Sequence, residues 1–204
     1  MKTPNRPKLE KLLVGIFAAL GALLMTGCAG QQVTYPRIAV APMYNRSEHT
    51  QAGPRLSRSL TRKLSTAFPN SDVILLSAEN MREMHGHDPL AEGTLPLKAL
   101  THCRQQYSAD AVVIGAITNY HPYWNMSLGV RLKVIDTGNA TVIARLSRQW
   151  DAGSPRVQKE IQQYYRQNRN SNDCRFGPDL FTVSPRYFML FVAHSMAREI
   201  EKDI

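Results

Sequence analysis

Acidic residues, cysteine and long apolar runs are all scarce in this sequence, and each shortage limits what the protein can be. The 204 residues include 16 Asp and Glu against 25 Lys and Arg, a formal net charge of +9 that favours anionic partners. With three cysteines the chain can form one disulfide at most. The longest uncharged apolar run, residues 12–25, is shorter than the roughly 20 residues that a membrane-spanning helix needs.

Catalytic motifs are missing as well. The sequence has no Gly-x-Ser-x-Gly elbow, no glycine-rich phosphate loop and no helical histidine pair of the zinc-protease type. Ser195 directly follows His194 in a helical pattern, and adjacent residues on a helix do not face each other. The sequence therefore predicts a non-catalytic protein that uses no cofactor.

The start of the chain has the layout of a secretory signal. Basic residues lead into the apolar run 12–25, and Met25-Thr26-Gly27-Cys28 closes it. This order resembles a bacterial lipoprotein signal, in which a peptidase cuts before the cysteine and the cysteine is acylated with palmitate-like chains. We therefore expect a signal peptide over residues 1–27, the acylated cysteine and a short tether over 28–36, and a single periplasmic domain over 37–204.

The residues after Cys28 bear on where the protein resides. Ala29 and Gly30 follow it, and the absence of aspartate there resembles lipoproteins that are sorted to the outer membrane. In an organism with a single membrane the anchor would lie in the cell membrane. Removal of the signal, with four basic residues and one acid, lowers the formal charge from +9 to +6. In the periplasm the anionic partners are phospholipid, lipopolysaccharide, peptidoglycan or acidic polysaccharide, and nucleic acid is excluded by compartment.

Hydrophobic periodicity predicts strands and helices in mixed order. Apolar runs of buried strands occur at 38–41, 73–76 and 111–117, and alternating patterns at 128–134 and 142–147 predict an antiparallel meander. Helical patterns occupy 54–67, 155–167 and 185–204, and a further one starts at Thr94-Leu95-Pro96 and extends to Tyr107. The order β-α-β-α-β-β-β-α predicts an α+β fold, a mixed and mostly antiparallel sheet with helices packed on one face.

Three segments carry a resemblance to a known family. They are Ile38 to Pro42 with the following loop and helix, Ser108 to Ile117, and Val130 to Gly138. Together they resemble the curli-secretion lipoproteins, whose relatives include exopolysaccharide-export lipoproteins and outer-membrane activators of peptidoglycan synthases. The loops at 43–53 and 118–127 are too short for pore-forming hairpins, whose strands need about 9–11 residues each. The resemblance therefore implies a poreless relative.

The sequence leaves two questions open, namely whether Cys103 and Cys174 pair and whether the run from His85 to Asp88 binds a metal ion. Cys103 and Cys174 either pair in the oxidising periplasm or stay as two buried thiols. The run from His85 to Asp88 offers two imidazoles and a carboxylate, but a polar loop that contains histidine is the commoner meaning of such a run. We assign no metal to it.

Two surfaces are candidates for contact with partners. Tyr120, Tyr123 and Trp124 surround a proline after a strand and suit a half-wet boundary with lipid headgroups or a neighbouring subunit. A second candidate is an anionic-ligand surface on the first helix, joined by cations of the adjacent strands. Its residues are Arg55, Arg58, Arg62 and Lys63, with Arg131, Lys133, Arg145 and Arg148 on the strands.

These patterns favour a lipid-anchored periplasmic assembly or accessory subunit of an envelope machine for secretion or polysaccharide export, with protein partners that include further copies of itself. Alternatives are a regulator of a peptidoglycan synthase and a ligand- or metal-binding lipoprotein. About seven residues separate Cys28 from the first strand, and at roughly 3.6 Å per residue they reach about 25 Å. That short reach favours a role close to the anchoring membrane.

Overall fold

The computed structural model describes residues 34–77, 79 and 96–204. Three predictions lie outside these residues, namely the signal peptide over residues 1–27, the lipidation of Cys28 and the loop from His85 to Asp88. Among the described residues, no helix combines the length and apolar character needed to cross a bilayer.

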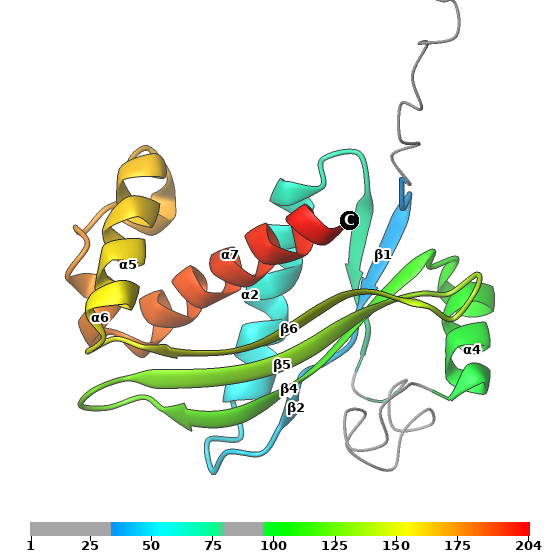
Figure 1. The fold of residues 1–204 in the computed structure, drawn as a ribbon, viewed down its shortest axis with the longest axis horizontal. Coiled ribbons are helices and arrows are strands. Elements are labelled where there is room, and N and C mark those ends of the chain that lie inside the picture. The colour runs from blue at the N-terminus through cyan, green and yellow to red at the C-terminus, as the bar shows by residue number, and fades with distance from the viewer. Residues whose placement is uncertain (1–33, 78, 80–95) are drawn as a thin grey trace, which may run out of the picture. The chain divides into compact units, whose positions relative to one another are not determined.

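The chain forms one mixed sheet of six strands in the described part (Figure 1). The strands are β1 (Arg37–Val40), β2 (Tyr44–Asn45), β3 (Asp72–Leu75), β4 (Ala111–His121), β5 (Ser127–Asp136) and β6 (Val142–Asp151). Their order is β3-β1-β4-β5-β6, with β2 paired to β4. Strand β1 runs parallel to β3 and β4, and the long strands β4, β5 and β6 form the predicted antiparallel meander.

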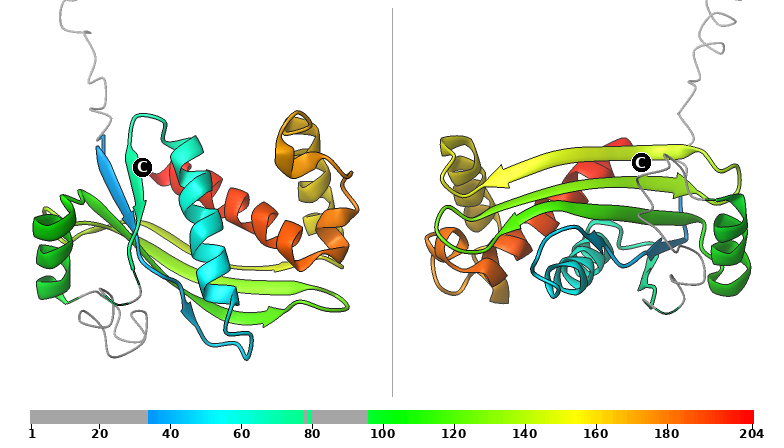
Figure 2. Two further views of the ribbon diagram at one scale, coloured as in Figure 1. Left: turned by 180° about the vertical axis from the view of Figure 1, so that it is seen from behind. Right: turned by 90° about the horizontal axis from the view of Figure 1, so that it is seen from below.

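Helices pack on both faces of this sheet (Figure 2). They are α2 (Ala52–Ala67), α4 (Leu97–Tyr107), α5 (Pro155–Gln167), α6 (Leu180–Val183) and α7 (Pro185–Asp203), with a 3₁₀ turn at Asn172–Cys174. The α+β class and the mixed sheet are confirmed. The expectation that helices cover one face is wrong for α4, because the strands are apolar on both sides where they meet it. Val112 and Ile114 pack with Leu100 of α4, whereas Ala111 and Val113 face α2 and α7.

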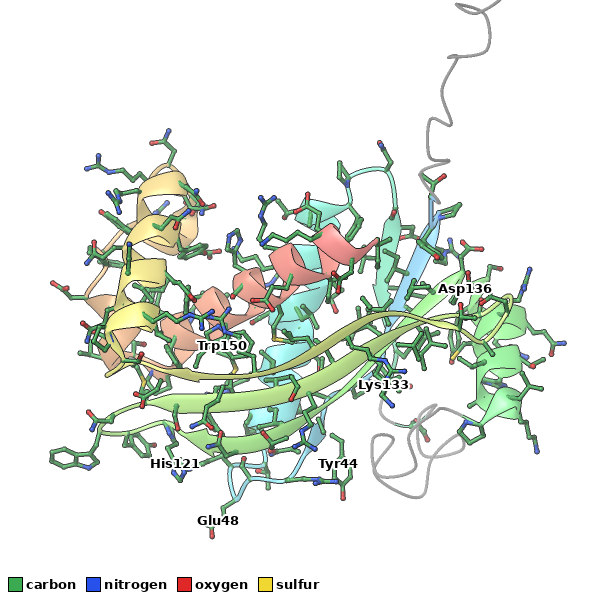
Figure 3. The ribbon with its side chains drawn as sticks, viewed as in Figure 1. Tyr44, Glu48, His121, Lys133, Asp136 and Trp150 are labelled. Atoms are coloured by element: carbon green, nitrogen blue, oxygen red, sulfur yellow. The ribbon has the colours of Figure 1, made fainter. Side chains whose placement is uncertain are left out.

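The larger core lies between the meander and the pair α2 and α7. Side chains alternate along β5, so that Leu128, Val130, Leu132 and Val134 are buried on this side. Trp150 of β6 is fully buried in the same core, and Figure 3 shows it on the helix side of the sheet with Lys133 on the other.

Strand β4 is longer than the sequence predicted, because a β-bulge restores its alternation. Ile117 pairs with Val130 and Asn119 with Gly129, which leaves Thr118 as the extra residue. Tyr120 consequently faces the same core as Ile117, and the strand continues to His121. The loop from β4 to β5 is therefore shorter than expected. It lies at the end of β4 opposite to the end that pairs with β1.

Candidate functional site

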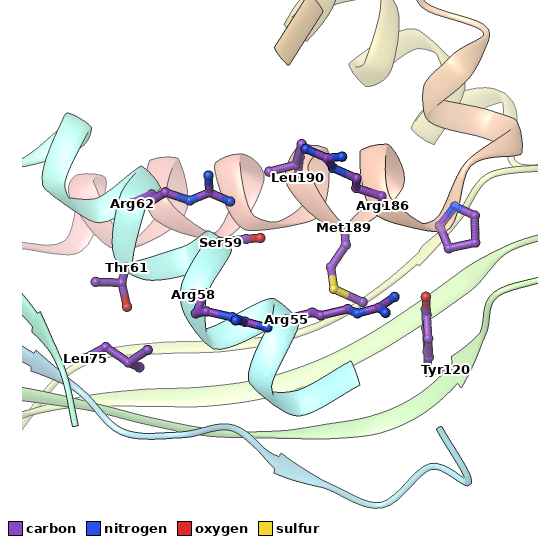
Figure 4. A pocket seen from close by; sticks show the side chains of 11 residues that line it. Arg55, Arg58, Ser59, Thr61, Arg62, Leu75, Tyr120, Arg186, Met189 and Leu190 are labelled. Carbon is purple, nitrogen blue, oxygen red and sulfur yellow. The ribbon is translucent and has the colours of Figure 1, made fainter. Parts of the chain in front are cut away.

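Four arginines line a groove between α2 and α7 (Figure 4). Arg55, Arg58 and Arg62 come from α2, and Arg186 comes from the start of α7. The groove has a volume of about 720 Å³. We call it the arginine groove, defined by these four side chains and the residues between them.

The spacing of α2 explains why its arginines share one wall. Positions 55, 58 and 62 follow each other at three and four residues, which places them on one side of a helix. Leu56, Leu60 and Leu64 repeat every four residues and are buried against the sheet and α7. The amphipathic pattern thus fixes the helix on its leucines and leaves the arginines exposed.

Lys63, predicted to belong to this surface, lies elsewhere. Its Nζ is 2.8 Å from Asp173 Oδ2 and 3.3 Å from the hydroxyl oxygen of Tyr164. Burial, the largest single influence, lowers the pKa of Lys63, but the hydrogen bonds and charges of Asp173 and Tyr164 together outweigh it, and the net pKa is raised. Lys63 therefore ties α2 to the segment after α5 and is not part of the arginine groove.

The positive charge of the groove is not neutralised within the part of the chain that the structure describes. Arg58 donates to the backbone oxygen of Pro54 at 3.3 Å and Arg186 lies 5.8 Å from the ring centre of Tyr187, but none of the four arginines forms an ion pair there. The pairs Arg55/Arg58 and Arg58/Arg62 place like charges three and four residues apart, which destabilises a helix by about 0.2–0.5 kcal/mol each.

Helix ends add to this charge. Arg55 lies in the first turn of α2 and Arg186 in the first turn of α7, and neither first turn carries an acidic residue. Because a helix N-terminus carries about half a positive charge, both positions add a cation to an already positive end.

The floor of the groove is mostly apolar. Leu75, Met189 and Leu190 line it, and Ser59, Thr61 and Tyr120 add hydroxyl groups. Burial raises the pKa of Tyr120, and the nearby positive charge of Arg55 opposes that rise. The groove can therefore receive a ligand that carries anionic groups beside an apolar part.

The strand cations do not join this surface. Arg131, Lys133 and Arg145 lie on the sheet face away from α2 and α7, with Lys133 and Arg145 paired across β5 and β6. Arg148 is on the helix side, where it donates to Glu160 and Glu199 and lies 5.0 Å from the ring centre of Trp150. The prediction that strand and helix cations form one surface is therefore wrong.

The loop between β4 and β5 carries an exposed aromatic pair. Trp124 is 96% exposed and Tyr123 is 69% exposed. Trp124 has a φ of +50°, a left-handed conformation that costs a residue with a Cβ roughly 1–2 kcal/mol. We call Tyr123 and Trp124 the aromatic tip. Tyr120 is only 7% exposed, so its assignment as a contact residue is corrected to a core position beside the arginine groove.

A cleft joins the tip to the groove. His49 packs edge-on against Tyr120 and Tyr123, with ring centres 5.4 and 6.2 Å apart. The cleft also contains Arg55 and Met189, which line the arginine groove as well. The two surfaces are therefore continuous.

Of the two alternatives left open for Cys103 and Cys174, the structure has the two separate buried thiols and not the disulfide. Each keeps its thiol, and each is buried in a different core on opposite faces of the sheet. Burial raises the pKa of Cys103 to about 11 and also raises that of Cys174. Spacing along the chain could not reveal this separation, because it depends on which face of the sheet α4 covers.

Metal-binding clusters do not occur in the described ranges: no group of three or more His, Cys, Asp or Glu side chains there could hold a metal ion.

Sequence reasoning missed two surface residues. Arg186 completes the groove, and Val183, which is 71% exposed, lies near the aromatic tip. Both lie close to Ser184-Pro185. This pair predicts the start of a helix, but it does not predict which other elements pack beside that start.

No family model and no curated protein matches the chain. Among solved structures, the PelC dodecamer from Paraburkholderia phytofirmans is similar over 57% of this chain and 71% of that one, with 21% identity and a TM-score of 0.44. Lipoprotein GNA1162 from Neisseria meningitidis is similar over 67% and 99%, with 18% identity and a TM-score of 0.44. The LpoB C-terminal domain from Salmonella enterica is similar over 59% and 86%, with 12% identity and a TM-score of 0.40. At these values the likenesses say nothing of function, and membership of the curli-secretion group stays a prediction.

Proposed function

We propose that this chain is a lipid-anchored, periplasmic accessory subunit of a cell-envelope machine, and that it acts by contact rather than catalysis. The observation that carries the proposal is the aromatic tip. Trp124 holds a large apolar ring almost fully in solvent on a backbone conformation that glycine would adopt at lower cost. An exposed aromatic pair beside the apolar Val183 is the composition expected of a contact surface.

The position of the tip favours a protein as its partner over the anchoring membrane. The start of β1 pairs with the start of β4, since Ile38 lies opposite Ala111, whereas the aromatic tip follows the other end of β4. The 11 residues of β4 span about 33 Å. The tether predicted from Cys28 reaches about 25 Å, so an anchor at the start of β1 allows the tip to stand as much as about 33 Å farther from the bilayer than the start of β1 does.

The same geometry weighs on the alternative roles. A regulator that must reach a synthase rooted in the opposite membrane is helped by a long tether, and this tether is short. A ligand or metal carrier would rest on the loop from His85 to Asp88, which lies outside the described residues. A subunit that meets its partner close to the anchoring membrane, whether another copy or a different protein, agrees best with both the tether and the tip.

A photo-crosslinking amino acid placed in the full-length chain in living cells tests the proposal. At position 124 we expect cross-links to a protein, identified by mass spectrometry. At Leu97, which is 71% exposed on α4, we expect none, so this position is the matched control. Equal cross-linking at both positions, or cross-links from position 124 to lipid alone, would contradict a specific protein contact.

A second measurement addresses the anchor separately. Labelling with a fatty-acid probe should mark the wild-type chain and not the Cys28→Ala variant. Unchanged labelling of Cys28→Ala would remove the basis for an acyl anchor at this cysteine while leaving the contact role of the tip open.

A further inference from the structure

We propose that the arginine groove binds an acidic segment of the protein partner, with carboxylates held by the arginines and an apolar side chain seated on the groove floor. The inference rests on the proposed function in one respect only, since it takes the partner to be a protein. Its chemistry follows from the groove itself.

The charges of the groove call for a ligand with several negative groups. Arg55, Arg58, Arg62 and Arg186 face a common space, and no ion pair within the described residues neutralises them. The N-termini of α2 and α7 add partial positive charges at the same end of the groove. Like charges gathered in a concave site with apolar walls focus the field and attract an oppositely charged partner. Guanidinium groups bind carboxylates through paired hydrogen bonds.

The length of the groove argues against a single small anion, and the proposed protein contact at the adjoining aromatic tip favours a polypeptide over an acidic polysaccharide. The row from Arg55 to Arg62 extends about 10 Å along α2, at 1.5 Å per residue. A single phosphate or headgroup is too compact to meet the whole row and Arg186 on the opposite wall at once. A peptide with Asp or Glu at helical spacing presents carboxylates at matching intervals, and an apolar side chain between them fits Leu75, Met189 and Leu190.

The cleft at His49 makes this assignment consistent with the aromatic tip. The cleft shares Arg55 and Met189 with the groove and contains Tyr123 of the tip. One partner can therefore cover the groove, the cleft and the tip as a single continuous surface. The tip would supply the apolar anchor of such an interface and the groove its charge selectivity.

The test uses the full-length lipidated protein in a neutral detergent and a fluorescent helical peptide with Glu and Leu at helical spacing. The variant Arg55→Gln/Arg58→Gln/Arg62→Gln removes the row. The control Arg131→Gln/Arg145→Gln/Arg166→Gln removes the same charge from exposed positions elsewhere. By fluorescence anisotropy we expect the groove variant to weaken the Kd by about tenfold or more and the control by less than about twofold, and we expect a peptide with Gln in place of Glu not to bind.

Each other outcome counts against the inference. Equal weakening in both variants would show that net charge and not the groove attracts the peptide. If phosphatidylglycerol mixed into the neutral detergent displaces the peptide from the wild type and from the control variant, and phosphatidylcholine does not, the occupant is lipid and the inference is overturned. Cross-linking at position 124 tests the proposed function independently of the groove. Cross-links to a protein at this position together with no peptide binding would contradict the groove hypothesis and leave the proposed function standing.

Discussion

The two tryptophans of this chain should respond in opposite ways to truncation. Trp150 is fully buried on the helix side of β6, its Nε1 donates to Ser195 Oγ at 3.3 Å, and the guanidinium of Arg148 stacks on its ring. Replacing a buried tryptophan with alanine removes these contacts and leaves a cavity, at a cost of about 3–5 kcal/mol. For a domain of this size, that lowers the melting temperature by about 6–20 °C.

Trp124→Ala should do almost nothing to stability. A side chain that is 96% exposed loses no packing on truncation, so the free energy of unfolding should change by less than about 0.5 kcal/mol. The left-handed backbone stays equally strained with alanine, whereas Trp124→Gly should relieve that strain and raise the melting temperature slightly. With the cross-linking residue moved to position 123, both variants should lose the protein cross-links expected from this loop.

Thermal unfolding followed by circular dichroism measures these differences, and fluorescence supplies an independent reading. The chain has two tryptophans, so Trp124→Phe and Trp150→Phe each leave a single emitter. The emission of Trp124 should lie at long wavelength and be quenched readily by iodide, and that of Trp150 should be blue-shifted and protected. If Trp124→Ala lowered the melting temperature as much as Trp150→Ala, the tip would be a packed element and the contact surface would lose its basis.

Three further predictions concern groups away from the tip. Denatured protein treated with iodoacetamide without reductant should show Cys103 and Cys174 both alkylated, whereas in native protein Cys103 should react slowly because burial raises its pKa to about 11; a mass lower by two hydrogens with both sites unmodified would restore the disulfide. Burial, with the charges of Lys63 and Arg198, lowers the pKa of His194 from 6.5 to about 4. As the pH falls from 6.5 toward 4, the unfolded state therefore binds a proton at His194 that the folded state does not, and the free energy of unfolding should decrease. Urea denaturation at a series of pH values should show this decrease in the wild type and a smaller one in His194→Gln. Arg58→Gln removes both like-charge pairs on α2 and should leave stability unchanged or raise it by about 0.4–1 kcal/mol, and a marked loss would mean that the arginine is structural.

The sequence patterns that succeeded are local ones. The meander follows from strict alternation in β5 and from turn residues before β6, and the exposed arginine row follows from the four-residue repeat of leucines on α2. Both patterns are complete within a single element, so no knowledge of the tertiary fold was needed to recognise them.

The predictions that failed depend on contacts between distant segments. Lys63 is one position from Arg62, yet its side chain reaches Asp173, a residue 110 positions away. Cys103 and Cys174 looked able to pair until α4 proved to cover the second face of the sheet. Arg186 could not be assigned to the groove without the packing of α7 on α2. Periodicity gives the direction of a side chain on its own element but not the element that will meet it.

One irregularity of the sheet connects the groove with the tip. The extra residue Thr118 shifts the alternation of β4 by one position, so that Tyr120 turns inward to the end of the arginine groove instead of outward. Without the bulge, Tyr120 would join the outer face, the cleft at His49 would lose its inner wall, and the aromatic tip would be separated from the groove. Gly129 faces the bulge, where a Cβ would lie 2.5 Å from Thr118 Oγ1 and 2.7 Å from Asn119 Oδ1, so a larger residue would require these two side chains to move. The continuity of the proposed contact surface thus depends on a bulge whose extra residue, Thr118, lines neither the arginine groove nor the cleft.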